Sequence, residues 1–169
     1  MSQFDKMNRI EKRISRSLSL QIYYAWDMSQ THPRELLDHM KYLLDDKEIN
    51  DNFYINGSPI DNDEAILNNN IVDYAYKLIE ATINNSDEID KFITKKLKNW
   101  DLKRIALIDK LILRLSLTEM FFFDEIPNKV SIVEGVEIAK IYGNTESSAF
   151  VNGVLDSLYN DLEDNKIKI

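Results

Sequence analysis

Apolar residues recur every three or four positions along most of the chain, which is the period of amphipathic helices. Between residues 4 and 29, at about 100° per residue, they form one stripe: Phe4, Met7, Ile10, Ile14, Leu18, Ile22 and Ala25. Four basic residues with helical spacing fall on the opposite side: Arg9, Lys12, Arg13 and Arg16. Leu20, Tyr23 and Tyr24 fall nearer the basic side. The pattern predicts one helix with a core face and a basic face.

The same period predicts three more helices before residue 100. Pro33 opens a second helix over residues 33–46, because proline suits the first helical turn. Residues 47–62 are rich in Asn, Asp, Gly and Pro, and they predict a loop. The third and fourth helices are expected at about 63–84 and 87–98.

The last third of the chain predicts three helices. Asp101 is a candidate cap for a fifth helix that ends near Phe123. Ser131 and Glu134 have capping-box spacing for a sixth helix over about 131–142. A seventh helix starts at Thr145 or Glu146 and reaches about residue 162, leaving residues 163–169 as a tail. No segment alternates as a strand does, so the prediction is an all-α protein with six or seven helices.

Composition agrees with this picture. A chain of 169 residues with 44% hydrophobic content suits one domain with a sizeable core. Four glycines and three prolines are few for a β-rich protein, and the absence of cysteine excludes a disulfide framework and a cysteine-based metal site. The sequence has no apolar run of membrane-spanning length and no secretory signal pattern, so we expect a cytoplasmic protein with no membrane partner.

Charge is distributed unevenly. The net charge is −8, but residues 1–16 carry five basic and two acidic residues, a net charge of +3. The remaining residues carry 16 basic and 27 acidic side chains, a net charge of −11. A basic segment is therefore joined to an acidic body. Its positive potential is local, and an anionic ligand would relieve the mutual repulsion of its cations. A solvated helix face that aids solubility is the alternative interpretation.

The residues give no positive sign of an enzyme, a metal site or a cofactor. Two histidines, His32 and His39, are typical of surface or capping positions, and no phosphate-binding, zinc or serine-nucleophile motif occurs. Asp109 is the most unusual acidic residue, because it lies in the apolar run "IALIDKLILRL". Asp109 either forms an ion pair with Lys110 or Arg114, or it has a functional role rather than a structural one.

The segment "SSAFVNGVLD", residues 147–156, combines small polar residues with an abrupt apolar run. In a helix, Phe150, Val154 and Leu158 share one stripe, and Gly153 would allow close contact with another helix. Alternatively, an exposed Phe150 beside an amide side chain suits the stacking and base-edge contacts that read single-stranded RNA. The residue types alone leave both interpretations open.

Residues 99–162 resemble the C-terminal half of the NusB family of bacterial transcription antitermination factors. The matching signals occur in order: Trp100, "ID" followed by "LR" and Glu119, "IP.KV", "EIAK..G", Ser147 and "FVNGVLD" at 150–156. Residues 12–29 are similar to the Arg-rich first helix of that family and its continuation. Residues 30–98 match only loosely.

The resemblance implies two packed helical bundles, about 1–84 and 85–162, with no catalytic activity. It also implies binding to single-stranded boxA RNA of ribosomal RNA leader transcripts, together with the ribosomal protein NusE, in a complex that helps RNA polymerase pass terminators. The RNA-binding residues that it suggests are Lys12, Arg13, Arg16, Gln21, Glu146, Ala149 and Phe150. The NusE-facing residues are Tyr24, Asp109 and Glu119. Some members of the family self-associate, so the resemblance also suggests that this chain forms a homodimer.

Two departures from the family pattern bear on affinity. Ala149 stands where the family often has a basic residue, and "VEG" at 133–135 replaces the usual "NEA". Weaker RNA binding and altered packing of the sixth helix are therefore expected. The alternative function is a helical protein-interaction module with weak or lost RNA binding.

Overall fold

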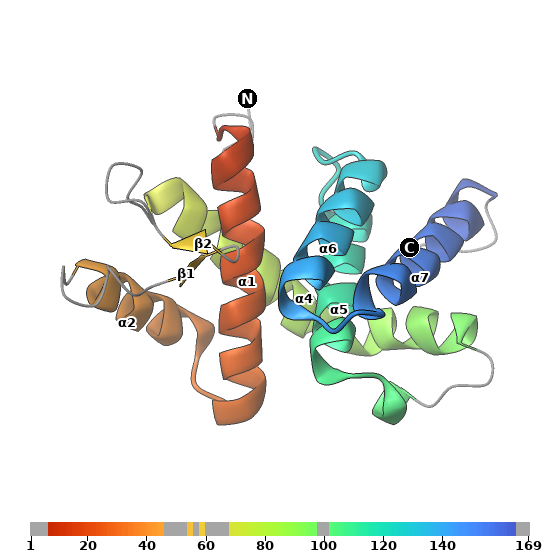
Figure 1. Cartoon of the computed structure of the whole chain (residues 1–169), viewed down its shortest axis with the longest axis horizontal. Helices are drawn as coiled ribbons and strands as arrows, with labels where there is room; N and C mark the ends of the chain where they lie inside the picture. Colours follow the sequence, from red (N-terminus) through yellow and green to blue (C-terminus); the bar gives the residue numbers. More distant parts are fainter. Residues whose placement is uncertain (1–6, 46–53, 56–57, 60–67, 98–101, 165–169) are drawn as a thin grey trace. The chain divides into compact units, whose positions relative to one another are not determined.

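The computed structural model describes residues 7–45, 54–55, 58–59, 68–97 and 102–164. These residues hold six α-helices, one short 3₁₀ helix and two short strands (Figure 1), which confirms the all-α class. They belong to two compact units, Met1–Glu80 and Ala81–Ile169. The boundary lies inside a helix, whereas the sequence analysis placed it at a break near residue 84.

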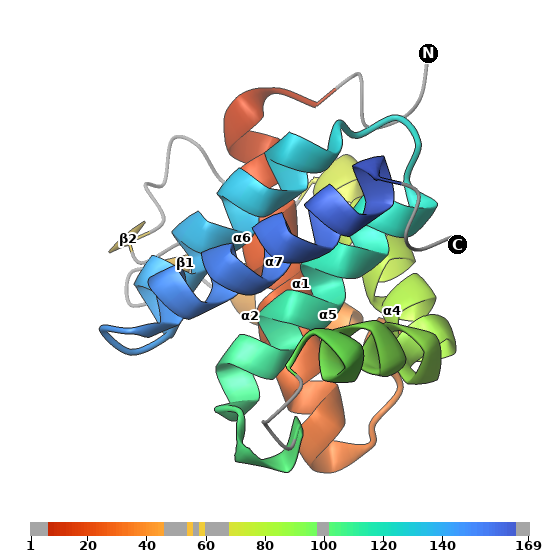
Figure 2. The ribbon, with the colours of Figure 1, turned by 90° about the vertical axis from the view of Figure 1, so that its right-hand side faces the viewer.

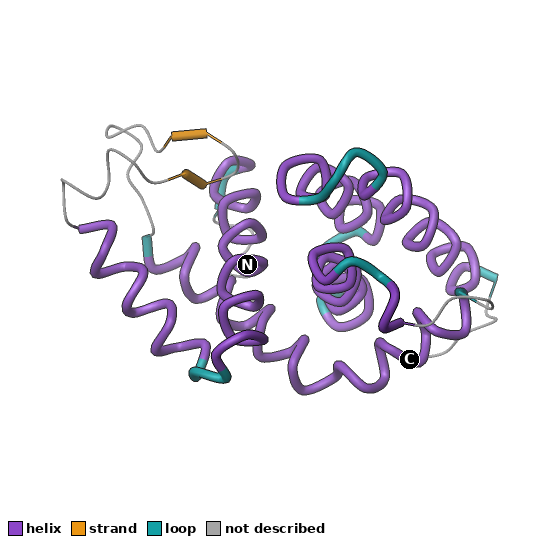
Figure 3. The backbone as a smooth tube through the Cα atoms, turned by 60° about the horizontal axis from the view of Figure 1, so that its bottom comes forward, coloured by secondary structure: helices purple, strands orange, loops and turns teal. Residues whose placement is uncertain are grey.

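The first unit contains α1 (Arg9–Ser29), α2 (Pro33–Asp45) and the first part of α4 (Asn69–Lys96). α1 packs against α2 and also contacts strand β1 (Tyr54–Ile55), which pairs antiparallel with β2 (Ser58–Pro59; Figure 3, orange). This hairpin lies in a segment that the sequence analysis predicted as a loop. The two residues between the strands are Asn-Gly, the dipeptide that favours tight hairpins.

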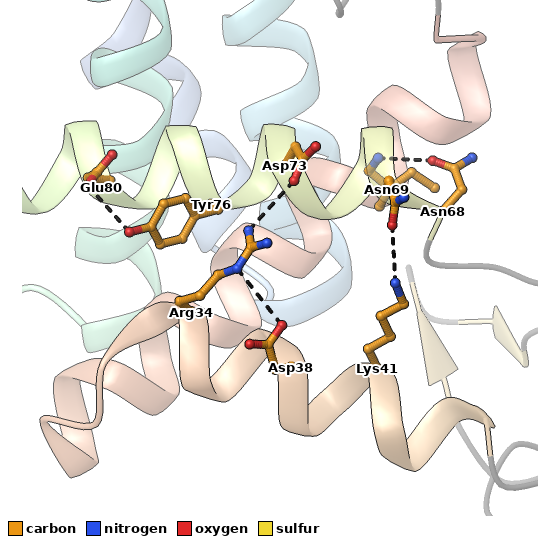
Figure 4. A network of polar contacts seen from close by, with 9 residues as sticks. Arg34, Asp38, Lys41, Asn68, Asn69, Asp73, Tyr76 and Glu80 are labelled. Atoms are coloured by element: carbon orange, nitrogen blue, oxygen red, sulfur yellow. Dashed lines mark hydrogen bonds and ion pairs between the residues drawn. The ribbon is translucent and has the colours of Figure 1, made fainter.

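Polar contacts join α2 to α4 within the first unit (Figure 4). Arg34 Nη1 lies 3.6 Å from Asp73 Oδ1, and the Arg34 guanidinium lies 5.4 Å from the centre of the Tyr76 ring. Further along α2, Lys41 Nζ donates a hydrogen bond to Asn69 Oδ1 at 3.1 Å. These contacts are exposed, so each contributes little to stability by itself.

α4 runs without a break from Asn69 to Lys96. The prediction of two helices, 63–84 and 87–98, was therefore wrong. The polar run that was read as a break satisfies itself on the helix backbone: Asn85 Nδ2 donates to Ala81 O at 2.7 Å, and Ser86 Oγ donates to Ile83 O at 3.0 Å. Side-chain hydrogen bonds of this kind allow Asn and Ser to stay inside a helix.

The second unit contains the end of α4, a 3₁₀ helix (η2, Leu102–Arg104), α5 (Leu107–Phe122), α6 (Asn128–Tyr142) and α7 (Ser147–Glu163). α6 packs against both α5 and α7, and α5 also contacts α7 (Figure 2). α5 is buried along most of its length, as expected of a helix that is apolar on nearly every side.

Two ion pairs tie the end of α4 to the other helices of this unit. Arg114 on α5 binds the Asp90 carboxylate through both Nε (2.8 Å) and Nη2 (2.6 Å). Lys96 Nζ lies 2.5 Å from Asp161 Oδ2 on α7. The two-point geometry of the Arg114 contact fixes orientation as well as distance.

Three helix starts in this unit differ from the predictions. α5 begins at Leu107, after a separate 3₁₀ helix; Asp101 lies outside the described residues. α6 begins at Asn128, because Pro127 occupies the N-cap position, so the proposed capping box at Ser131 was wrong. α7 begins at Ser147, with the backbone N–H groups of Glu146 and Ser147 bound to Asn144 Oδ1.

Candidate nucleic-acid interface

The first turn of α1 carries the cations at the start of the candidate interface. Asn8 caps the helix: its Oδ1 accepts a hydrogen bond from Glu11 N at 2.9 Å, and its own N–H donates to Glu11 Oε2 at 2.8 Å. Arg9 is exposed, whereas Lys12 and Arg13 are half-buried. The helix therefore starts at a defined point and places three cations within its first five residues.

Arg16 does not lie on a solvated face. It is only 5% exposed, and residues 15–20 are buried on every side of the helix. Serines make this burial tolerable, since Ser15 Oγ donates to Glu11 O at 2.8 Å and Ser19 Oγ donates to Ser15 O at 2.7 Å. The prediction of one basic face along the helix was wrong at this position.

The aromatic residues of α1 are also partly buried and partly exposed. Tyr23 was predicted on the basic side, but it is fully buried and stacks on Trp26, with the ring centres 5.5 Å apart. Tyr24 is 40% exposed and stays a candidate contact residue. Ile10, predicted in the core stripe, is 54% exposed, while Leu18 and Ile22 are buried as predicted. Gln21 is half-buried.

The start of α7 carries the other RNA-binding candidates. Glu146 and Ala149 are exposed, and Phe150 is half-buried. Gly143 shapes the turn before them: a Cβ there would meet the Ser147 side chain and lie 2.7 Å from Ala139 O. Close approach of the chain after α6 therefore requires glycine.

The "FVNG" segment is partly core. Val154 and Leu158 are buried, as one of the two interpretations predicted, and so are Val151 and Leu155 beside them. Gly153, however, makes no close helix contact, because a Cβ at this exposed position would meet nothing within 4 Å. Asn152 is exposed, and its Nδ2 donates to Asp156 Oδ2 at 2.9 Å.

Asp109 lies in the first turn of α5 and is 6% exposed. Neither of its predicted partners binds it: Arg114 pairs with Asp90, and among the described residues no hydrogen bond reaches the buried Asp109 Oδ1. A buried acceptor without a donor is costly, so the Asp109 carboxylate is unfavourably placed among the described residues.

Glu119 on α5 is 2% exposed, and its Oε2 accepts a hydrogen bond from Ser131 Oγ on α6 at 2.5 Å. Glu119 therefore lies between α5 and α6, where it contributes to their packing. A direct surface role, which the resemblance suggested, does not fit this burial.

Sequence reasoning missed one contact near the interface. Glu11 Oε1 accepts a hydrogen bond from Asn68 Nδ2 at 2.6 Å, which joins the start of α1 to the start of α4. The spacing Asn8-x-x-Glu11 is a capping signal and would have identified the local half of this arrangement. The partner 57 positions away has no local signal.

Other candidate chemistry is limited in the part of the chain that the structure describes. No group of three His, Cys, Asp or Glu residues there could hold a metal ion. His32 acts at a helix start, where its Nδ1 accepts a hydrogen bond from Arg34 N at 3.2 Å. None of the described helices has the length and hydropathy of a membrane span.

The structure places Lys12, Arg13 and Arg16 on α1 of the first unit, and Glu146, Ala149 and Phe150 at the start of α7 of the second unit. The helices and their packing define an all-helical protein of two units. Comparison with known families is specific: the model of the NusB family matches residues 13–160. The chain belongs to the NusB family.

Individual relatives agree with this assignment. The transcription antitermination protein NusB of Bacillus licheniformis is 35% identical over 154 residues, which cover 91% of this chain and 100% of that protein. The protein of the same name in Chloroherpeton thalassium is 34% identical over 154 residues; the match covers 91% of this chain but only 64% of that relative. In a crystal structure of the antitermination factors NusB and NusE in complex with dsRNA, one chain has the same fold. Its TM-score is 0.67 at 24% identity, and the match covers 90% of this chain and 98% of that one.

Proposed function

We propose that this chain is a transcription antitermination factor that binds single-stranded boxA-type RNA of ribosomal RNA leader transcripts together with NusE. The observation that carries the proposal is the cluster of cations on the capped first turn of α1, in a chain whose net charge is −8. Family membership supports it. In this role the protein acts in the cytoplasm, as part of the complex that lets RNA polymerase pass terminators.

The residues suit a division of labour on RNA. Lys12 and Arg13 neutralise phosphates, which positions a strand without reading its sequence. Phe150, half-buried at the start of α7, offers a ring on which a base stacks. Glu146 is exposed beside it and accepts hydrogen bonds from base amino groups rather than from phosphates. Arg16, which is 5% exposed with its Nη2 atom buried, and the half-buried Gln21 offer RNA less surface.

One carboxylate and one exposed ring suit a basic protein partner. Tyr24 presents 40% of its surface, and Asp109 Oδ1 lacks a hydrogen-bond donor among the described residues. The negative charge of this carboxylate would attract a Lys or Arg of NusE, and opposite charge would speed association. Glu119 acts indirectly in this scheme, by holding α5 against α6 through Ser131. A homodimer of the free chain stays a prediction.

The second candidate function is a protein-interaction module with weak RNA binding. Ala149 favours it, because this exposed position at the start of α7 supplies no cation. The burial of Arg16 favours it too, since one of the three cations expected to contact RNA is largely withdrawn from solvent.

Fluorescence anisotropy of a labelled boxA-like RNA separates the two functions. The protein is titrated alone and as an equimolar mixture with NusE, at two salt concentrations. The variant Lys12→Ala/Arg13→Ala is compared with Lys91→Ala/Lys95→Ala, which removes two exposed cations from α4. We expect tighter binding with NusE, and a salt slope that falls by about 0.7 for each lost phosphate contact in the first variant only.

Equal loss of affinity in both double variants would mean that only overall charge matters, and would remove the assignment to α1. Binding of NusE without any binding of RNA, by a folded protein, would establish the interaction module instead.

A further inference from the structure

The Glu11 carboxylate is engaged on both sides. Its Oε2 accepts the Asn8 N–H at 2.8 Å and completes the cap of α1. Its Oε1 accepts a hydrogen bond from Asn68 Nδ2 at 2.6 Å. The only acidic residue within the first turns of α1 is therefore held by two donors.

Asn68 is also engaged at both ends of its amide. While Nδ2 reaches Glu11, Oδ1 accepts a hydrogen bond from Ile71 N at 3.1 Å, in the first turn of α4. The two side chains form a tie between the starts of two helices that are far apart in sequence. Each residue caps its own helix and binds the other.

Among the described residues, few side chains before Ser15 are buried. Met7 is buried just before the helix, but Arg9 is exposed and Ile10 is 54% exposed. The continuously buried part of the helix begins only at Ser15. Terminal turns fray unless they are capped or packed, so the order of this turn depends strongly on its polar contacts.

We propose that Glu11, through Asn68, is a positioning residue for RNA binding. The tie holds the turn that carries Lys12 and Arg13 in one conformation, so that binding RNA does not require the turn to be ordered first. This inference rests on the proposed function, because it concerns the same cations. Charge alone would lead one to expect that an acidic residue beside phosphate-binding residues weakens RNA binding. The proposal is the opposite: Glu11 favours RNA binding.

The variant Asn68→Ser isolates the tie. Serine still caps α4, and the net charge and Glu11 are unchanged, but the donor to Glu11 is lost. We expect the dissociation constant for the boxA-like RNA to rise about fivefold with an unchanged salt slope. We also expect faster hydrogen exchange at Lys12 N, which bonds Asn8 O at 3.1 Å. An unchanged midpoint of chemical denaturation would exclude a general loss of stability.

Asn69→Ala is the matched control, since it deletes a neighbouring hydrogen bond, from Lys41 Nζ, that has no link to α1. It should leave the RNA affinity unchanged. A mutant cycle adds a second check: in a Glu11→Ala background, Asn68→Ser should have no further effect on affinity, because the tie is already broken.

Unchanged affinity in Asn68→Ser, or equal losses in Asn68→Ser and Asn69→Ala, would overturn the positioning role. An additive effect in the mutant cycle would do so too. Failure of the proposed function looks different: the unmodified chain would not bind the RNA, or Arg13→Ala would bind it equally well. Either of those results would overturn both proposals.

Discussion

Replacing Gly153 by alanine should stabilise the protein. Gly153 lies inside the 17-residue helix α7, at an exposed position where an added Cβ would meet no atom within 4 Å. Glycine in a helix interior costs about 1 kcal/mol relative to alanine, because the unfolded chain loses more conformational freedom. No packing loss opposes this gain, so the free energy of unfolding should rise by about 1 kcal/mol.

Urea denaturation followed by circular dichroism measures this effect. For a chain of this size, a gain of about 1 kcal/mol corresponds to a rise in melting temperature of roughly 2–4 °C, which a thermal scan checks independently. The denaturant slope should not change, because the buried area is the same. A lower midpoint would show that Gly153 meets a neighbour after all, as one interpretation of the sequence held, and would refute the reasoning from open space.

Three further substitutions test the packing of the second unit. Gly135→Ala should destabilise it by about 1–2 kcal/mol, since a Cβ there would overlap Ser116 Oγ on α5; adding Ser116→Ala should restore most of the loss of melting temperature. Gly143→Ala should cost more, about 2–3 kcal/mol, because the obstacle includes backbone, with Ala139 O 2.7 Å away; a denaturation midpoint equal to that of Gly135→Ala would contradict this order. Arg114→Ala should cost about 1.5–3 kcal/mol, because it leaves the Asp90 carboxylate, 27% exposed, without its two-point partner. A double-mutant cycle of unfolding free energies measures that coupling, and a value near zero would show that water replaces the pair.

Much of the helical plan followed from local signals. Pro33 and Gly143 mark ends that the structure confirms for α2 and α6, since proline suits a first turn and the glycine admits close approach of the chain. Signals of this kind need only a few neighbouring residues. The same holds for Val154 and Leu158, whose spacing correctly predicted a buried side of α7.

The errors arose where a polar side chain finds its partner in its own helix or far along the chain. Asn85 and Ser86 look like a break in sequence, yet their bonds to α4 carbonyls keep the helix intact. Ser131 looked like a helix cap, but its hydroxyl donates a hydrogen bond to Glu119 on another helix. Periodicity records where polar residues are, and not which group satisfies them, so it cannot separate a solvated position from a satisfied buried one.

The same distinction explains why α1 is divided along its length rather than into two faces. A stripe model assumes that one side of a helix meets solvent throughout, but residues 15–20 are buried all round, while Arg9, Ile10, Tyr24 and Met28 are exposed. Lys12 and Tyr24 therefore lie toward opposite ends of the helix, with the candidates Arg16 and Gln21 between them. Twelve positions separate Lys12 from Tyr24, or about 18 Å at 1.5 Å per residue. A ligand at either end would share no side chain of this helix with a ligand at the other. Within α1, coupling between a ligand at Lys12 and a ligand at Tyr24 would pass through the buried residues 15–20. The order of the RNA end of the helix depends on the tie between Glu11 and Asn68.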